Sequence, residues 1–164
     1  MRLISSSAEE TLEIAAAVAG VCRSGDTVLL SGAMGAGKTV FAQGFGAALG
    51  VREAITSPTF TLVNSHPADG LTLHHADLYR LDRTTEIADL ALAELAEFDG
   101  IVLIEWGEVT ADEVPGHLAI HISPGDPDQS EDRREFELSS SGERWVGRWD
   151  RLRERLSVFA EEPC

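Results

Sequence analysis

Residues 32–39 read GAMGAGKT, which is a complete Walker A pattern, G-x-x-x-x-G-K-[ST]. The glycines let the backbone curl so that successive N–H groups face one phosphate group. Lys38, the only lysine in the chain, adds a positive charge near the β- and γ-phosphates, and the Thr39 hydroxyl is a ligand for Mg²⁺. The pattern predicts a loop that binds a nucleotide triphosphate; a glycine-rich turn without a ligand is the alternative.

The sequence on both sides of this loop fits a phosphate-binding unit. The apolar run at residues 28–30 predicts a short buried strand before the loop. After it, apolar residues recur at helical spacing from Val40 to Leu49, until Gly50 ends the pattern. Strand, glycine loop and helix in this order are the setting that the pattern requires.

Length and charge limit the class of protein. A chain of 164 residues can bury one core, so we expect a single domain over residues 1–164. The net charge of −15 argues against a direct, extended contact with nucleic acid, which needs clustered cations. No apolar stretch is long enough to span a membrane, and the two cysteines form no disulfide framework. We therefore expect a cytoplasmic protein with no membrane association.

The rest of the chain alternates between helical and strand patterns. Ser7 and Glu10 form a capping box, which predicts a helix that continues to about Gly25 with Leu12 on its apolar face. A hairpin is expected from residues 59–65 and 71–78 around a turn at 66–70. Further patterns predict a helix at 85–98, strands at 101–104, 117–123 and 134–139, and an amphipathic helix at about 143–160 whose arginines face solvent.

Two carboxylates end apolar runs, and each is a candidate ligand or catalytic group. In α/β folds such groups lie at the carboxyl ends of strands beside the phosphate loop. A carboxylate there is costly unless it is paired, hydrated or bound to a cation. We expect Glu105 to bind Mg²⁺, with a cap or salt bridge as the alternative. Asp77 is either a carboxylate of the nucleotide site or a partner of Arg80 or Arg83 in a structural ion pair.

Two further features concern the histidines and the base of the nucleotide. His74 and His75 lack the additional spaced ligands of a zinc site, so we expect them to pack against the sheet or the nucleotide. A guanine-reading N-K-x-D motif is absent because no second lysine exists. ATP is therefore favoured over GTP by elimination.

Four stretches together are similar to a known family. They are the Walker A loop, SPTFTLV at 57–63, HADLYRL at 75–81 and IEW at 104–106. Their order and spacing resemble the TsaE family, the ATPase component of bacterial tRNA threonylcarbamoyladenosine synthesis. The resemblance runs from about Thr11 to Ser140, and the arginine-rich stretch from Ser141 matches the family poorly.

The resemblance implies an α/β fold of the three-layer, P-loop NTPase type, with a central mixed, partly antiparallel sheet flanked by helices. It implies a weak Mg²⁺-dependent ATPase that is not itself the threonylcarbamoyl transferase. The TsaD and TsaB subunits would carry that transfer, so this chain would meet tRNA only through the complex. An acidic face could then dock on a more basic partner under nucleotide control. A small-molecule kinase and a nucleotide-gated assembly factor without essential hydrolysis are the alternatives.

The resemblance also assigns roles to individual residues. Thr39 and Glu105 would bind Mg²⁺, while Lys38 and Asp77 would be catalytic. Thr59 would belong to a loop that responds to the nucleotide, and Trp106 would contact the nucleotide or act as a hydrophobic plug. The residues expected to bind ATP are Thr11, Gly32, Met34, Gly35, Ala36, Gly37, Lys38, Thr39, Val40, Thr59, Trp106, Glu108 and Arg134.

Overall fold

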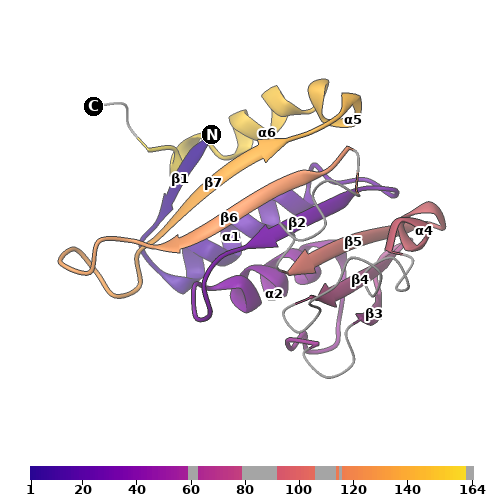
Figure 1. Ribbon diagram of the computed structural model, residues 1–164, viewed down its shortest axis with the longest axis horizontal. Helices are drawn as coiled ribbons and strands as arrows, with labels where there is room; N and C mark the ends of the chain where they lie inside the picture. The colour runs from indigo at the N-terminus through magenta and orange to yellow at the C-terminus, as the bar shows by residue number, and fades with distance from the viewer. Residues whose placement is uncertain (59–62, 79–91, 106–113, 115, 162–164) are drawn as a thin grey trace.

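A computed structural model of the chain describes residues 1–58, 63–78, 92–105, 114 and 116–161. They form one mixed sheet of seven strands in the order β1-β7-β6-β2-β5-β4-β3, with helices on both faces (Figure 1). The expected α/β fold with a mixed, partly antiparallel sheet is therefore confirmed.

The centre of the sheet is parallel. β2 pairs with β5 on one side and β6 on the other, and β4 pairs with β5. β2 and β5 are buried along almost their whole length, as expected for parallel strands between two layers of helices. The bounds are β2 Thr27–Ser31, β4 Thr72–Asp77, β5 Gly100–Glu105 and β6 Leu118–Pro124.

The edges of the sheet are antiparallel. β7 (Arg134–Ser140) pairs with β6, and β1 (Arg2–Ser5) pairs with β7. β1 was not expected from the sequence, because four residues are too few to show a pattern and only the pairing with β7 makes them a strand. At the other edge β3 (Val63–Pro67) pairs with β4, which confirms the hairpin but places its turn at residues 68–71.

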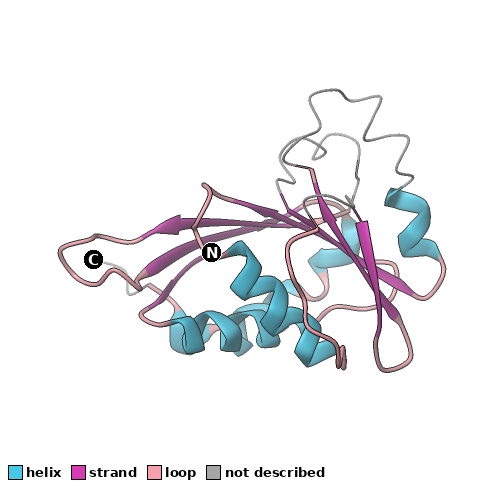
Figure 2. Ribbon diagram, turned by 90° about the horizontal axis from the view of Figure 1, so that it is seen from below, coloured by secondary structure: helices cyan, strands magenta, loops and turns pink. Residues whose placement is uncertain are grey.

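The helices divide into two layers. α1 (Ala8–Ala19) and α2 (Lys38–Leu49) cover one face and share the larger core cluster, while α4 (Leu92–Glu97) covers part of the other. Figure 2 shows most of the helices gathered beneath one face of the sheet. Residues 85–91 of the expected helix at 85–98 lie outside the described residues. No described helix combines the length and the apolar content needed to cross a bilayer.

The first helix begins as expected and ends earlier. Ser7 Oγ accepts a hydrogen bond from the Glu10 N–H at 3.2 Å, and the Glu10 carboxylate accepts one from the Ser6 N–H at 2.7 Å. The helix stops at Ala19 and not near Gly25, because the chain turns there to enter β2. Leu12, which was expected on the buried face of this helix, is exposed. The buried face consists of Thr11, Ile14, Ala15, Val18 and Ala19.

α1 and α2 approach each other at backbone distance. A Cβ atom on Gly44 of α2 would lie 2.8 Å from the Leu12 carbonyl oxygen of α1. Only glycine fits this position without moving one helix. The contact sets the position of α2, whose first turn carries the end of the Walker A loop, and Phe41 and Phe45 pack below it with ring centroids 6.2 Å apart.

The C-terminal region is not the continuous helix expected over residues 143–160. It consists of α5 (Glu143–Val146), α6 (Trp149–Arg155) and a 3₁₀ turn (Ser157–Phe159). The interruption at residues 147–148 turns two side chains inward, because Trp145 is fully buried and Arg148 is 7% exposed. The expectation that the arginines face solvent is therefore wrong for Arg148.

Arg148 joins the C-terminal region to the start of the central strand. Its guanidinium donates two hydrogen bonds to the buried carboxylate of Asp26, at 2.6 and 2.8 Å, and a third to the Val21 carbonyl at 3.1 Å. The guanidinium also lies 4.2 Å from the centroid of the Trp145 ring. The hydrogen bonds with Asp26 raise the pKa of Arg148 above its usual value. This buried pair fixes α5 and α6 against the residue that precedes β2.

We expect Arg148→Ala to lower the free energy of unfolding by about 3–5 kcal/mol, because it leaves the Asp26 carboxylate buried without its cation. Urea denaturation measures the effect. Arg151→Ala removes an exposed arginine from the same region and should change the free energy by less than about 0.5 kcal/mol. Equal losses in the two variants would contradict a structural role for the buried pair.

Candidate functional site

The Walker A loop connects β2 to α2 in the conformation that its glycines permit. Gly32, Gly35 and Gly37 have φ angles of +146°, +79° and +108°, values that other residues rarely adopt. A Cβ atom on Gly32 would also collide with the Ile122 carbonyl oxygen of β6. The first turn of α2 carries no acidic side chain. The positive end of the helix dipole and the N–H groups there are therefore not neutralised by a carboxylate of the same helix. The loop has the local structure of an anion-binding site.

The Lys38 side chain folds back onto the Walker A loop. Its side chain is 7% exposed, and Nζ donates hydrogen bonds to the carbonyl oxygens of Gly32 at 2.7 Å and Ala33 at 3.0 Å. The ammonium is thus held beside the same backbone whose N–H groups would bind a phosphate. Of the other loop residues expected to bind ATP, Met34 is 73% exposed, while Ala36 is 1% exposed and belongs to the core.

Arg134 reaches the loop from the far end of the chain. It begins β7, and its Nε donates a hydrogen bond to the Ala36 carbonyl at 3.0 Å. Nη1 donates to the carbonyl oxygens of Glu131 at 2.7 Å and Arg133 at 2.8 Å. The structure therefore brings Arg134 to the Walker A loop, and these hydrogen bonds fix its guanidinium there.

The two strand-end carboxylates are direct neighbours in the sheet. Glu105 is the register partner of Leu30 in β2 and of Asp77 in β4. Because side chains alternate along a strand, Glu105 lies on the same face as Leu103, and Asp77 on the same face as Leu73. Leu73 and Leu103 belong to the core cluster that contains α2, so both carboxylates lie on the face that this helix covers.

Glu105 has the environment of a cation ligand. Its side chain is 3% exposed, His75 Nε2 lies 3.4 Å from Oε1, and neither atom has a hydrogen-bond partner among the described residues. A buried carboxylate oxygen without a hydrogen bond is costly, and either an ion pair with His75, the salt bridge left open by the sequence, or a divalent cation would compensate this cost. Among the described residues no three acidic, histidine or cysteine side chains form a metal site by themselves. Mg²⁺ commonly combines one or two protein oxygens with phosphate oxygens, so Thr39 and Glu105 fit this ion together with a nucleotide.

Asp77 is also buried, with 5% of its surface exposed. Ser57 Oγ donates a hydrogen bond to Oδ2 of Asp77 at 2.9 Å. Ser57 was not singled out as a site residue from the sequence, because its distance of twenty positions from Asp77 gives no sign of contact. The alternative partners of Asp77, Arg80 and Arg83, lie outside the described residues.

Several other expected residues are placed differently or not described. The Thr11 hydroxyl is buried and shares a hydrogen bond of 2.9 Å with Ser5, so its contact with ATP stays a prediction. Val40 is half-buried in the first turn of α2. His74 Nδ1 lies 2.8 Å from Ser65 Oγ, and burial lowers the pKa of His74.

Three expected site residues lie outside the described part of the chain, and they are Thr59, Trp106 and Glu108.

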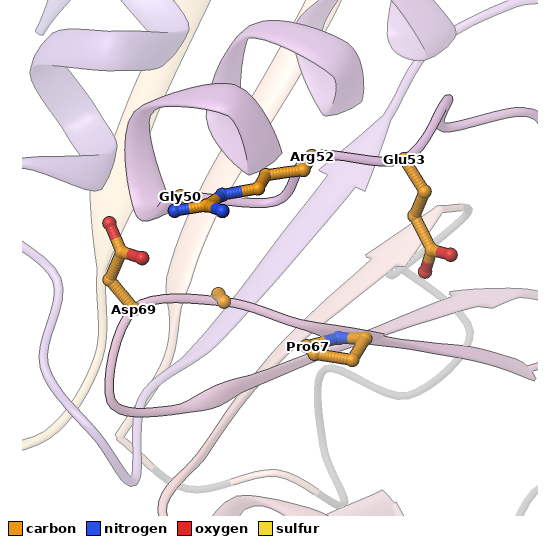
Figure 3. Close-up of a pocket in the computed structure, with 6 residues that line it drawn as sticks. Gly50, Arg52, Glu53, Pro67 and Asp69 are labelled. Carbon is orange, nitrogen blue, oxygen red and sulfur yellow. The ribbon is translucent and has the colours of Figure 1, made fainter.

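A separate pocket of about 310 Å³ lies at the other end of α2. Figure 3 shows Gly50, which follows the last turn of the helix, with Arg52 and Glu53 beyond it and Pro67 and Asp69 opposite. Since the Walker A loop precedes α2, this pocket is a helix length away from the loop and contains none of the expected site residues.

The sequence matches a family model described as threonylcarbamoyl adenosine biosynthesis protein TsaE over residues 5–135. A Streptomyces coelicolor protein named tRNA threonylcarbamoyladenosine biosynthesis protein TsaE is 39% identical over 138 residues, which are 82% of this chain and 93% of the relative. The Bacillus subtilis protein of the same name is 36% identical over 138 residues, 84% of each chain.

A solved structure is similar along almost the entire chain. The crystal structure of YdiB from Bacillus subtilis superposes with a TM-score of 0.72 and 31% sequence identity. The superposition covers 96% of this chain and 94% of YdiB, so it extends beyond the region that the family model matches.

We expect Gly32→Ala to destabilise the fold more than Gly35→Ala. Both changes place alanine at a positive φ angle, which costs about 1–2 kcal/mol. Only Gly32 adds a collision with the Ile122 carbonyl, since an added Cβ on Gly35 meets nothing within 4 Å. Denaturant titration should show a further loss of about 1–3 kcal/mol for Gly32→Ala. Equal losses would mean that β6 does not constrain the loop.

Proposed function

This chain belongs to the TsaE family of threonylcarbamoyladenosine biosynthesis proteins, and we propose that it binds ATP with Mg²⁺ and hydrolyses it slowly in that pathway. The observation that carries this proposal is the pairing of Asp77 with Glu105 at the carboxyl ends of β4 and β5. Both carboxylates are buried on the face of the sheet that α2 covers, and a buried charge is costly, so a cation bound between them and the Walker A loop would compensate this cost.

Each group of the site has a separate task in this proposal. The loop N–H groups and Lys38 bind the phosphates, while Arg134 braces the loop through the Ala36 carbonyl. Thr39 and Glu105 would hold Mg²⁺, and the ion would supply positive charge that stabilises the negative charge of the phosphates.

Asp77 is the group proposed to act on the reacting atoms. It orients a water molecule whose oxygen forms a bond to the γ-phosphorus as the bond to the bridging oxygen breaks. ADP leaves with its electron pair, and the protons of the water pass to the released phosphate and to solvent. Proximity and orientation supply most of the acceleration in such a reaction, so the position of this carboxylate matters more than its strength as a base.

The partners in the proposal are the TsaD and TsaB subunits, with tRNA contacted only through them. The net charge of −15 supports this division, because an acidic chain repels the tRNA backbone and attracts a basic protein surface. Nucleotide binding would then regulate the association through residues that follow Ser57 in the chain. Equal affinity for the purified partners in ATP and in ADP would contradict the regulatory part.

We expect Lys38→Ala to weaken ATP binding at least tenfold at saturating Mg²⁺, because it removes the loop's charged phosphate ligand. Glu105→Gln preserves size and should reduce the gain in ATP affinity that Mg²⁺ produces, with little change when Mg²⁺ is absent. Isothermal titration calorimetry at several Mg²⁺ concentrations measures both effects. Wild-type ATP affinity of Lys38→Ala at saturating Mg²⁺, together with an unchanged Mg²⁺-dependent gain in Glu105→Gln, would contradict the proposed ligands.

We expect Asp77→Asn to lower the rate of ATP hydrolysis by about 100-fold or more while ATP binding is retained. Hydrolysis is measured without an added acceptor, and tRNA modification is measured in reactions reconstituted with TsaD and TsaB. Asp128→Asn removes an exposed carboxylate from a loop of the same protein and serves as the control. Multiple rounds of modification by a variant that cannot hydrolyse ATP would favour the assembly factor, and rapid transfer to a metabolite would favour the kinase.

A further inference from the structure

The hydrogen bond between Ser57 and Asp77 joins two segments that have different anchors. Asp77 ends β4 and is 5% exposed, so the sheet fixes its backbone and the core surrounds its side chain. The torsion that turns the carboxylate plane is broad in energy and is set by hydrogen bonds rather than by packing alone. The hydroxyl of Ser57 donates to Oδ2 at 2.9 Å and therefore restrains that torsion.

The segment that ends in Ser57 contacts the helix that follows the Walker A loop. The segment from Val51 to Pro58, which we name the connector, leaves the end of α2 and runs back along it. Gln43 Nε2 of α2 donates a hydrogen bond to the Ile55 carbonyl at 3.2 Å. The Ile55 side chain, 4% exposed, fills the space beside Gly46, where a Cβ atom would collide with it.

These contacts leave little freedom at Ser57. Ile55 is fixed to α2 by its carbonyl and by its side chain, and Ser57 follows only two residues later. The serine hydroxyl reaches Asp77 from a segment that is anchored on α2, the helix whose first residues hold the proposed phosphate and Mg²⁺ ligands. The Ser57–Asp77 hydrogen bond therefore joins β4 to the connector, and the contacts of Ile55 join the connector to α2.

We propose that Ser57 is a positioning residue for Asp77, and that the connector sets the orientation of this carboxylate relative to the Walker A loop. The inference rests on the proposed function of Asp77 in ATP hydrolysis. Ser57 acts through the carboxylate and not on ATP itself, so its removal should lower kcat and leave the binding of MgATP unchanged. A misorientation of a catalytic group by a fraction of an ångström is sufficient for a loss of tenfold or more.

The decisive comparison is Ser57→Thr against Ser57→Val, because the two side chains have nearly the same shape and only threonine keeps the hydroxyl. Since Ser57 is exposed, the added methyl group has room in both variants. We expect Ser57→Thr to retain kcat within about threefold of wild type and Ser57→Val to lose about tenfold, with KM within twofold in both. Steady-state ATP hydrolysis at saturating Mg²⁺ measures these values.

Two controls separate positioning from a general effect on the connector. Thr56→Val removes the neighbouring exposed hydroxyl and should keep wild-type kcat. Adding Ser57→Val to Asp77→Asn should lower kcat no further than Asp77→Asn alone, because a residue that acts through Asp77 has no effect once the carboxylate is gone. Additive losses in the double variant would overturn the inference.

The outcomes distinguish this inference from the proposed function. If wild type hydrolyses ATP and Asp77→Asn does not, but Ser57→Val matches Ser57→Thr, the positioning role is wrong and the proposed function stands. If wild type binds no MgATP by calorimetry or does not hydrolyse it, both fall together. A change in KM without a change in kcat would place Ser57 in nucleotide binding and would also overturn the inference.

Discussion

The register of the parallel strands determines where the proposed site lies. β2 leads into the Walker A loop, β5 lies directly beside it, and β4 follows. Leu30, Glu105 and Asp77 are register partners across β2, β5 and β4. The loop that follows β2 and the carboxylates that end β5 and β4 therefore lie at the same edge of the sheet. A slip of one residue would turn each carboxylate to the opposite face, away from α2. The buried apolar residues of these strands therefore hold the site in place.

The second constraint acts at the opposite end of the same strand. Asp26 precedes β2, and its buried carboxylate binds Arg148 in a region that the family model does not match. The pair holds α5 and α6 against the base of the central strand, with the fully buried Trp145 between them and the core. The strand is thus fixed at its start by an ion pair and at its end by the close contact of Gly32 with β6.

Contacts between the site and the rest of the fold arise from residues far apart in the chain. Arg134 reaches the Ala36 carbonyl from β7, and Ser57 reaches Asp77 from the connector. Ala36, Ser57 and Asp77 belong to stretches that the sequence singles out, but the sequence does not show these contacts. Both contacts restrain groups to which the proposed function assigns phosphate binding or hydrolysis, and residues that surround a catalytic group usually act in this way.

The sequence by itself determined the Walker A unit, the places of most strands along the chain and the position of both carboxylates at strand ends, because these depend on local patterns. It also identified Arg134, through the family resemblance and not through spacing. Only the tertiary structure decided that β1 is a strand, that the C-terminal helix breaks, that Arg148 is buried and that Ser57 contacts Asp77. Each of these depends on a partner that is twenty or more positions away in the chain, or on the space beside the residue. A periodic pattern within one segment carries no information about such a partner or such a space.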